Sequence, residues 1–83
     1  MSMAQLKGQI VRSLAGHDAG WLYWVADSEG DFLLLADGKH RTLARPKRKR
    51  RKHVELTGMS TAPAGDGALR RALAASRDLG SRR

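Results

Sequence analysis

Short apolar runs separated by polar turn residues make up the first two thirds of the chain. Three of these runs, at residues 9–14, 21–26 and 32–36, are dense in the β-branched, aromatic and other apolar side chains that suit strands. Two further strands are expected at residues 39–43 and 54–56, on either side of a charged segment. No window in this part of the chain keeps the period of an amphipathic helix. Five short strands in about 50 residues predict an all-β fold, a small closed or nearly closed barrel.

Turn residues mark where these strands should end. A glycine-bounded loop occupies residues 15–20, and a polar cluster occupies residues 27–31. Asp37 and Gly38 predict a tight type I′ hairpin, because both central residues of that turn need positive φ. We therefore expect the strand at residues 39–43 to return directly alongside the one before it.

The chain changes character in its last third. Residues 57–67 are rich in Gly, Ser, Thr, Ala and Pro and predict a linker. Asp66 suits the N-cap of a helix at residues 67–79. The apolar stripe of that helix is narrow and consists of Leu69, Ala72, Leu73 and Ser76. Because so short a helix is marginal in water, we expect a tail that is flexible alone and helical only against a partner.

Four aromatic side chains must supply much of the core volume. Trp21, Tyr23 and Trp24 lie close together, and Phe32 follows in the next expected strand. Strand alternation places Trp21 and Tyr23 on one face and Trp24 on the other. One of these faces has to fill the barrel, which leaves the other as a candidate platform for stacking nucleic-acid bases.

The charge of the chain is strongly positive and concentrated in one segment. The chain has 16 Lys and Arg residues against 8 Asp and Glu, a formal net charge of +8. Residues 45–53 hold seven of those cations and no acidic residue. Such a run repels itself unless a polyanion or solvent screens it, and its place between two expected strands favours a folded body that presents it to phosphates. A solvated loop that serves solubility and a nuclear-import signal are the other interpretations of such a run.

The glycine-bounded loop and its flanking strands resemble the KOW motif, which is a strand, a loop with spaced glycines and a second strand. The motif occurs in ribosomal proteins and transcription elongation factors. Gly16 and Gly20 allow backbone conformations that other residues rarely adopt, and they let an RNA backbone approach closely. Many KOW loops carry Lys or Arg where this chain has His17 or Ala19. This departure shifts the expected phosphate contacts toward residues 39–53.

The resemblance continues beyond that motif. The Ala-Asp-Gly-Lys turn at residues 36–39 and the Pro-Lys basic segment at residues 46–47 follow in the order found in small bacterial KOW-domain RNA-binding proteins. Those proteins are similar to ribosomal proteins of the L14e type. The resemblance covers residues 6–57 and implies an SH3-like β-barrel that binds RNA on or near the ribosome. The chain then divides into this barrel and, at residues 58–83, a linker with a basic tail.

We predict RNA contacts from two parts of the chain. Phosphate contacts are expected from Lys39, Arg41, Arg45, Lys47, Arg48, Lys49, Arg50, Arg51, Lys52 and His53. Shape-dependent contacts are expected from the loop residues Gly16, His17 and Gly20. An alternative for that loop is a plain hairpin turn in which Asp18 bonds nearby backbone N–H groups.

The expected partner is ribosomal RNA or a ribosome-assembly intermediate, with ribosomal proteins as further partners. An adaptor module that docks an acidic protein is the alternative from another functional class. A DNA-binding protein is a third interpretation of the same positive charge.

Catalysis, metal binding and membrane insertion lack support in the sequence. The chain has no cysteine, and its three histidines do not have the close spacing of metal ligands. No nucleophile with a neighbouring base and no phosphate-binding P-loop is visible. No apolar run reaches transmembrane length, and residues 1–7 have no signal-peptide core. We therefore expect a cytoplasmic binding protein that is not an enzyme and needs no cofactor, metal, membrane or small-molecule substrate.

Overall fold

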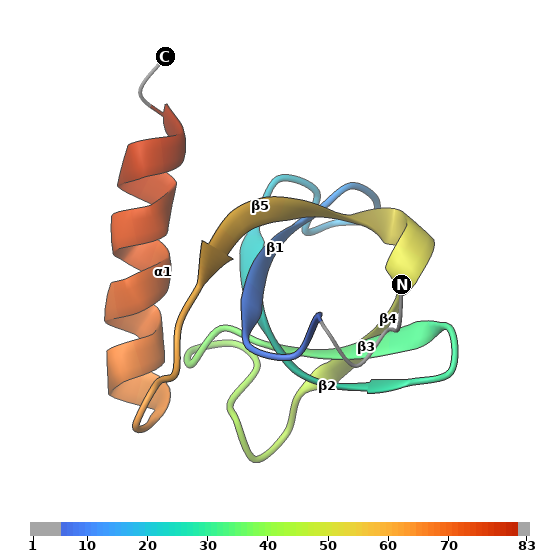
Figure 1. The fold of residues 1–83 in the computed structure, drawn as a ribbon, viewed down its shortest axis with the longest axis horizontal. Helices are drawn as coiled ribbons and strands as arrows, with labels where there is room; N and C mark the ends of the chain where they lie inside the picture. The colour runs from blue at the N-terminus through green and yellow to red at the C-terminus, as the bar shows by residue number, and fades with distance from the viewer. Residues whose placement is uncertain (1–5, 82–83) are drawn as a thin grey trace.

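A computed structural model describes residues 6–81 of the 83-residue chain. Within this range five strands come first and a long helix last (Figure 1). The strands are β1 (Gln9–Ser13), β2 (Leu22–Glu29), β3 (Phe32–Ala36), β4 (Lys47–Arg50) and β5 (Val54–Ser60). The remaining elements are a short 3₁₀ helix, η2 (Arg51–His53), between β4 and β5, and the helix α1 (Asp66–Ser81).

All five strands form one antiparallel sheet in the order β4-β3-β2-β1-β5. The sheet curls strongly, and η2 turns the chain from one of its edges toward the other (Figure 1). The edge strands β4 and β5 do not pair with each other in the described part of the chain, so the sheet stays open. The predicted all-β class is confirmed at the level of a small, mostly-β fold. The sequence predicts a closed or nearly closed barrel, and of these two forms the closed one is wrong.

Both faces of the central strands are buried, and they build two cores. The core inside the curl of the sheet consists of Leu6, Val11, Tyr23, Val25, Leu33, Leu35 and Val54. The core on the outer face consists of Ile10, Leu22, Ala36, Leu69 and Leu73. Neighbouring residues of β1, Ile10 and Val11, enter different cores, as the two-residue period of a strand requires. The apolar runs lack regular polar alternation because neither face of these strands meets much water.

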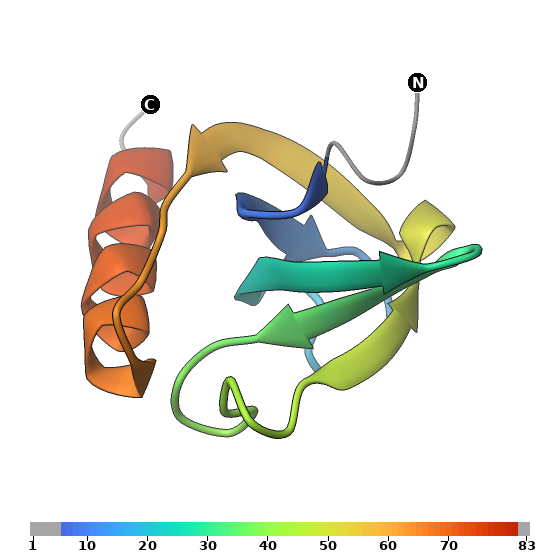
Figure 2. The ribbon, with the colours of Figure 1, turned by 60° about the horizontal axis from the view of Figure 1, so that its bottom comes forward.

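For the described residues the prediction of a flexible tail is wrong, whereas the predicted short helix is present. Residues 57–60 complete β5, and α1 packs against the outer face of the sheet (Figures 1 and 2). Leu69 and Leu73 are 0% and 2% exposed, and fully burying each stabilises the fold by about 1.5–3 kcal/mol. The sequence predicts that the helix at residues 67–79 needs a partner for its apolar stripe. The outer face of the chain's own sheet is that partner. Residues 82–83 of the predicted tail lie outside the described range.

The predicted strand at residues 39–43 and its tight turn are also wrong. Gly38 has φ +80°, but no residue other than glycine has positive φ in the described chain, so Asp37 and Gly38 do not form a type I′ turn. Asp37 Oδ1 accepts the backbone N–H groups of Lys39 at 2.9 Å and Arg41 at 2.8 Å. These two bonds shape a longer connection between β3 and β4.

The start of α1 is tied to this connection. Asp66 Oδ1 accepts the backbone N–H of Leu43 at 2.8 Å, and Arg70 donates to the carbonyl of Gly38 at 2.8 Å. Gly38 is buried, and a Cβ at this position would overlap the carbonyl oxygen of Asp66. The side chain expected to cap the helix thus bonds a loop from an earlier part of the chain, and the loop and the helix are positioned together.

The fourth strand lies inside the basic run. β4 pairs with β3, with Arg50 opposite Phe32 and Lys47 opposite Leu35. Because β4 contains only Lys and Arg, no hydrophobic pattern could reveal it. The pairing makes its side chains alternate in direction, so the basic run is divided between two faces of the sheet.

Candidate nucleic-acid interface

The loop between β1 and β2 turns one acidic side chain inward. Gly16 and Gly20 have φ of +87° and +91°, a region that favours glycine, as the sequence predicts. The backbone N–H of Gly20 donates to Ser13 O at 2.7 Å, and that of Trp21 donates to Asp18 O at 2.9 Å. The loop is therefore a compact turn, and Asp18 within it is only 6% exposed.

Four side chains surround the Asp18 carboxylate. Ser13 Oγ and Tyr23 Oη each donate to it at 2.8 Å. Lys47 Nζ and Lys49 Nζ from β4 reach it at 2.7 and 3.2 Å. A buried carboxylate is stable only when it is both paired and hydrogen-bonded, and these four donors meet that requirement. Asp18 thereby joins the glycine loop to β4.

The pKa values of this network follow from its donors. Burial by itself raises the pKa of the Asp18 carboxyl, but the hydrogen bonds from Lys47, Tyr23, Ser13 and Lys49 outweigh burial and hold that pKa well below its usual range. Burial, and then the hydrogen bond to Asp18, raise the pKa of the Tyr23 phenol above its ordinary value. At neutral pH the carboxylate is therefore charged, the phenol is protonated and the network is complete.

Lys47 and Lys49 differ from the other cations of the basic run. Their side chains are 23% and 11% exposed, and both ammonium groups are paired with Asp18. Lys49 Nζ also donates to Ala15 O at 2.9 Å. The sequence predicts phosphate contacts at both lysines, and the structure places both in the protein's own ion-pair network. Likewise, Asp18 bonds four side chains rather than the backbone N–H groups of its loop.

Other cations of the run face outward. Arg48 and Arg50 are exposed and lie over the Phe32 ring, with each guanidinium carbon 4.2 and 4.8 Å from the ring centroid, respectively. Lys52 is exposed and Arg51 half-buried in η2. We call Arg48, Arg50, Arg51 and Lys52 the β4 ridge. A hollow of about 390 Å³ is lined in part by the last three of these residues.

The remaining predicted contacts lie outside the ridge. Lys39, Arg41 and Arg45 are exposed on the connection between β3 and β4. His17 is exposed in the glycine loop, and His53 is half-buried at the end of η2. His17 and Arg41 border the same hollow of about 400 Å³, so the structure brings the glycine loop and the connection together.

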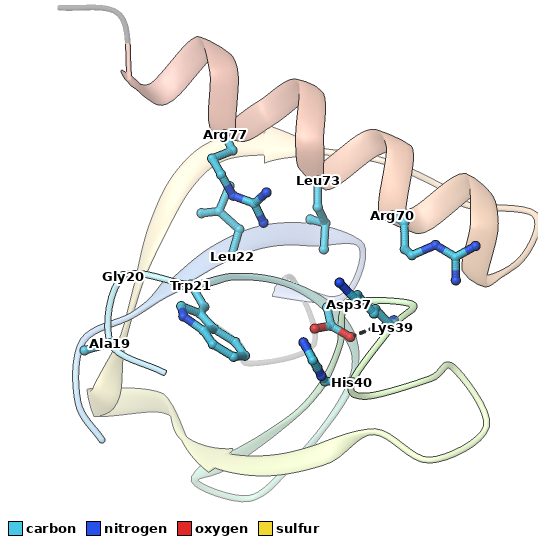
Figure 3. A pocket seen from close by; sticks show the side chains of 10 residues that line it. All are labelled: Ala19, Gly20, Trp21, Leu22, Asp37, Lys39, His40, Arg70, Leu73 and Arg77. Atoms are coloured by element: carbon cyan, nitrogen blue, oxygen red, sulfur yellow. Dashed lines mark hydrogen bonds between the residues drawn. The ribbon is translucent and has the colours of Figure 1, made fainter. Parts of the chain in front are cut away.

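A second cationic site lies between the glycine loop, the β3–β4 connection and α1. It is a cleft of about 530 Å³ (Figure 3). Trp21 lines this cleft with 45% of its surface exposed, and its ring centroid lies 5.4 Å from that of His40. Lys39, Arg70 and Arg77 supply positive charge to the cleft. We call this site the Trp21 cleft.

The sequence analysis missed most of the Trp21 cleft. Strand alternation predicts one face for Trp21 and Tyr23, but Trp21 precedes β2 and stays exposed while Tyr23 fills the inner core. Arg70 and Arg77 lie seven residues apart, which is about two helical turns and places both on one face of α1. That spacing is visible in the sequence, but only the docking of α1 on the sheet brings the two arginines to the same cleft as Trp21.

No known protein family matches the chain, and no curated protein matches it either. Among residues 6–81, no helix is long and apolar enough to cross a membrane. The same residues contain no group of three or more His, Cys, Asp or Glu side chains placed to hold a metal ion. The candidate interface is therefore defined by its own geometry, as a cationic ridge and a cationic cleft on one small scaffold.

Proposed function

We propose that this chain is an RNA-binding protein whose β4 ridge contacts the phosphates of folded RNA. The observation that carries the proposal is the placement of Arg48 and Arg50, whose guanidinium groups lie exposed over one aromatic ring at the edge of the sheet. Contact with Phe32 restricts both arginines before binding, so less conformational entropy is lost when a phosphate arrives. Folded RNA is recognised largely through its shape and its backbone, which suits a rigid row of cations.

The ion pair that Arg48 makes with Glu29 leaves the Arg48 guanidinium available to a phosphate. Glu29 lies 3.7 Å from Arg48, and both side chains are 59% exposed, so this ion pair contributes little. A guanidinium donates two parallel hydrogen bonds to a phosphate, a stronger arrangement than such a long surface pair. Phosphate therefore competes well with Glu29 for Arg48.

The KOW interpretation and the ribosomal partner are part of the same proposal. The order of strand, glycine loop and strand in β1 and β2, with positive φ at Gly16 and Gly20, supports a KOW-type module on an SH3-like barrel. We further propose ribosomal RNA or a ribosome-assembly intermediate as the target. Lys47 and Lys49 are already paired with Asp18. The glycine loop therefore contributes its shape to this interface, whereas the β4 ridge contributes the positive charge.

The salt dependence of RNA binding tests the ridge. Each lost phosphate contact reduces the slope of log K against log salt by about 0.7–0.9, so the double variant Arg48→Gln/Arg50→Gln should reduce it by about 1.4–1.8. The RNA is a structured ribosomal fragment, and binding is followed by filter retention or anisotropy. The matched control Lys7→Gln/Arg71→Gln removes the same charge from exposed positions outside the ridge and the cleft, and its slope should change far less.

Three outcomes would contradict the proposal. The first is a wild-type chain without affinity for RNA in dilute buffer, and the second is an equal slope for the ridge variant and its control. The third is recovery of an acidic protein without RNA, which would replace the proposal with an adaptor function. Preference for duplex DNA over structured RNA in competition would redirect the proposal to DNA.

A further inference from the structure

We propose that the Trp21 cleft binds one unpaired nucleotide of the RNA whose base carries an exocyclic amine, with that base stacked on Trp21 and its phosphate held by α1. This inference rests on the proposed function and deepens it. The ridge reads the backbone of any folded RNA, whereas the cleft selects RNA that offers a base outside the helical stack.

Trp21 presents an exposed aromatic ring from a backbone position that hydrogen bonds fix. Its backbone N–H donates to Asp18 O at 2.9 Å, and its carbonyl accepts the N–H of Ser13 at 2.9 Å. The other tryptophan, Trp24, is half-buried, and its indole N–H donates to two backbone carbonyls. Stacking with a base requires an accessible ring, and of the two tryptophans only Trp21 provides it.

Polar groups in the cleft suit the edge of a base that carries an exocyclic amine. Asp37 Oδ1 accepts two backbone N–H groups, while Oδ2 has no hydrogen bond within the described residues. That oxygen is an acceptor for an exocyclic amine, which adenine, guanine and cytosine carry and uracil lacks. The His40 ring lies tilted by 32° to the ring of Trp21 and lines the same cleft.

The arginines of α1 supply the charge for a phosphate. In Figure 3 the side chain of Arg77 extends from the helix toward Leu22 and Trp21. Its guanidinium has no ion pair or hydrogen bond with the side chains and backbone that the structure describes. Arg70, two turns earlier, is held by its bond to the carbonyl of Gly38. Among the described side chains, Arg77 is therefore a cation without a partner beside the stacking surface, and Arg70 is a cation held in place.

The dimensions of the cleft favour a single nucleotide. A volume of about 530 Å³ lies within the range of about 300–1,000 Å³ that small-ligand sites span. A duplex hides the faces of its bases within the stack and is too wide for a cleft of this size. Only an unpaired or extruded base presents both a face for Trp21 and an edge for Asp37.

Three RNA probes test this assignment on the full chain. They are a short oligo(A), an oligo(U) of the same length and a blunt RNA duplex. The wild type should bind oligo(A) more tightly than oligo(U). The variant Trp21→Leu should weaken oligo(A) binding about 5- to 150-fold, the size of one base–aromatic stack. Its affinity for the duplex should change by less than about twofold.

Matched arginine variants test the phosphate contact. Arg77→Gln should weaken the binding of both oligonucleotides several-fold, because a phosphate contact does not depend on the base. Arg71→Gln removes the same charge from an exposed position of the same helix that does not line the cleft. This control should bind both oligonucleotides as the wild type does.

Fluorescence separates a lost contact from a damaged fold. Trp21→Phe keeps an aromatic ring and leaves Trp24 as the sole tryptophan of the chain. Oligo(A) should quench the emission of the wild type and still bind Trp21→Phe, but it should leave the emission of that variant nearly unchanged.

Wild-type affinity for oligo(A) in Trp21→Leu, or quenching that persists in Trp21→Phe, would overturn the cleft assignment alone. Binding that responds to the ridge variants but not to the Trp21 and Arg77 variants would do the same and leave the proposed function standing. A wild-type chain that binds none of the three probes would overturn both.

Discussion

At the scale of single residues, Asp18 determines which lysines of the basic run meet solvent. Its buried carboxylate pairs with two ammonium groups and accepts hydrogen bonds from two hydroxyl groups. Sequence reasoning expects a polar loop residue here, because Asp between glycines is common in turns. The ion pairs stay hidden from such reasoning, since Lys47 and Lys49 are 29 and 31 residues away along the chain.

Replacing Asp18 with Asn should destabilise the protein by about 2–3 kcal/mol. Removing one partner of a buried pair costs about 3–5 kcal/mol, and the partial exposure of Lys47 lowers that value. Urea unfolding measures the loss. Asp31→Asn is the control, since Asp31 is exposed, and its stability should stay within about 0.5 kcal/mol of the wild type. Equal stability of the two variants would show that the network does not support the fold.

The contribution of Asp18 should disappear in acid. Because its pKa in the folded protein lies below the ordinary value, the unfolded chain takes up the proton first as the pH falls. The stabilisation is complete well above the ordinary Asp pKa of about 3.9 and is lost as the pH falls through and below that value. The gap in unfolding free energy between wild type and Asp18→Asn should therefore narrow from about pH 6 to about pH 3. A constant gap over this range would assign the effect to something other than the charge of Asp18.

At the scale of elements, the sequence predicts those whose pattern is local. β3 matches its predicted range of 32–36, and α1 contains the predicted helix at 67–79, because apolar runs and helix-start residues mark both. β4 escapes prediction since a strand of alternating Lys and Arg carries no hydrophobic signal. The docking of α1 also escapes, because the face that receives Leu69 and Leu73 is assembled from three separate strands.

Gly38 and Gly20 form a matched pair for measuring how firmly α1 is docked. Their φ angles are +80° and +91°, so alanine at either position is strained by about 1–2 kcal/mol. Only at Gly38 does the added methyl group overlap the backbone of Asp66, whereas nothing lies within 4 Å of it at Gly20. Gly38→Ala should therefore lose about 1–3 kcal/mol more than Gly20→Ala, with a weaker helical signal in circular dichroism. Equal losses in thermal unfolding would show that the helix start is not held against the connection.

At the scale of the whole molecule, the positive charge is divided among the Asp18 network, the β4 ridge and the Trp21 cleft. The sequence predicts residues 45–53 as one cationic segment, but the register of β4 against β3 decides which side chains turn outward. The cleft combines Trp21 with Lys39 and with Arg77, and no local pattern connects three segments so far apart. The sequence therefore predicts which segment carries the charge of the candidate site. The division of that charge among the network, the ridge and the cleft, and the contribution of Trp21, depend on tertiary structure.

The pairing of Lys47 and Lys49 with Asp18 also affects how the chain distinguishes one anionic polymer from another. In the folded protein these two ammonium groups are paired with Asp18 and do not bind a ligand. In the unfolded chain all seven cations of residues 45–53 can bind a flexible polyphosphate. A ligand that binds the unfolded chain as well as the folded one gives little net protection against heat. For an RNA-binding protein of this kind, a rigid folded RNA that fits the β4 ridge should raise the melting temperature of the protein more than a flexible polyanion of equal charge does.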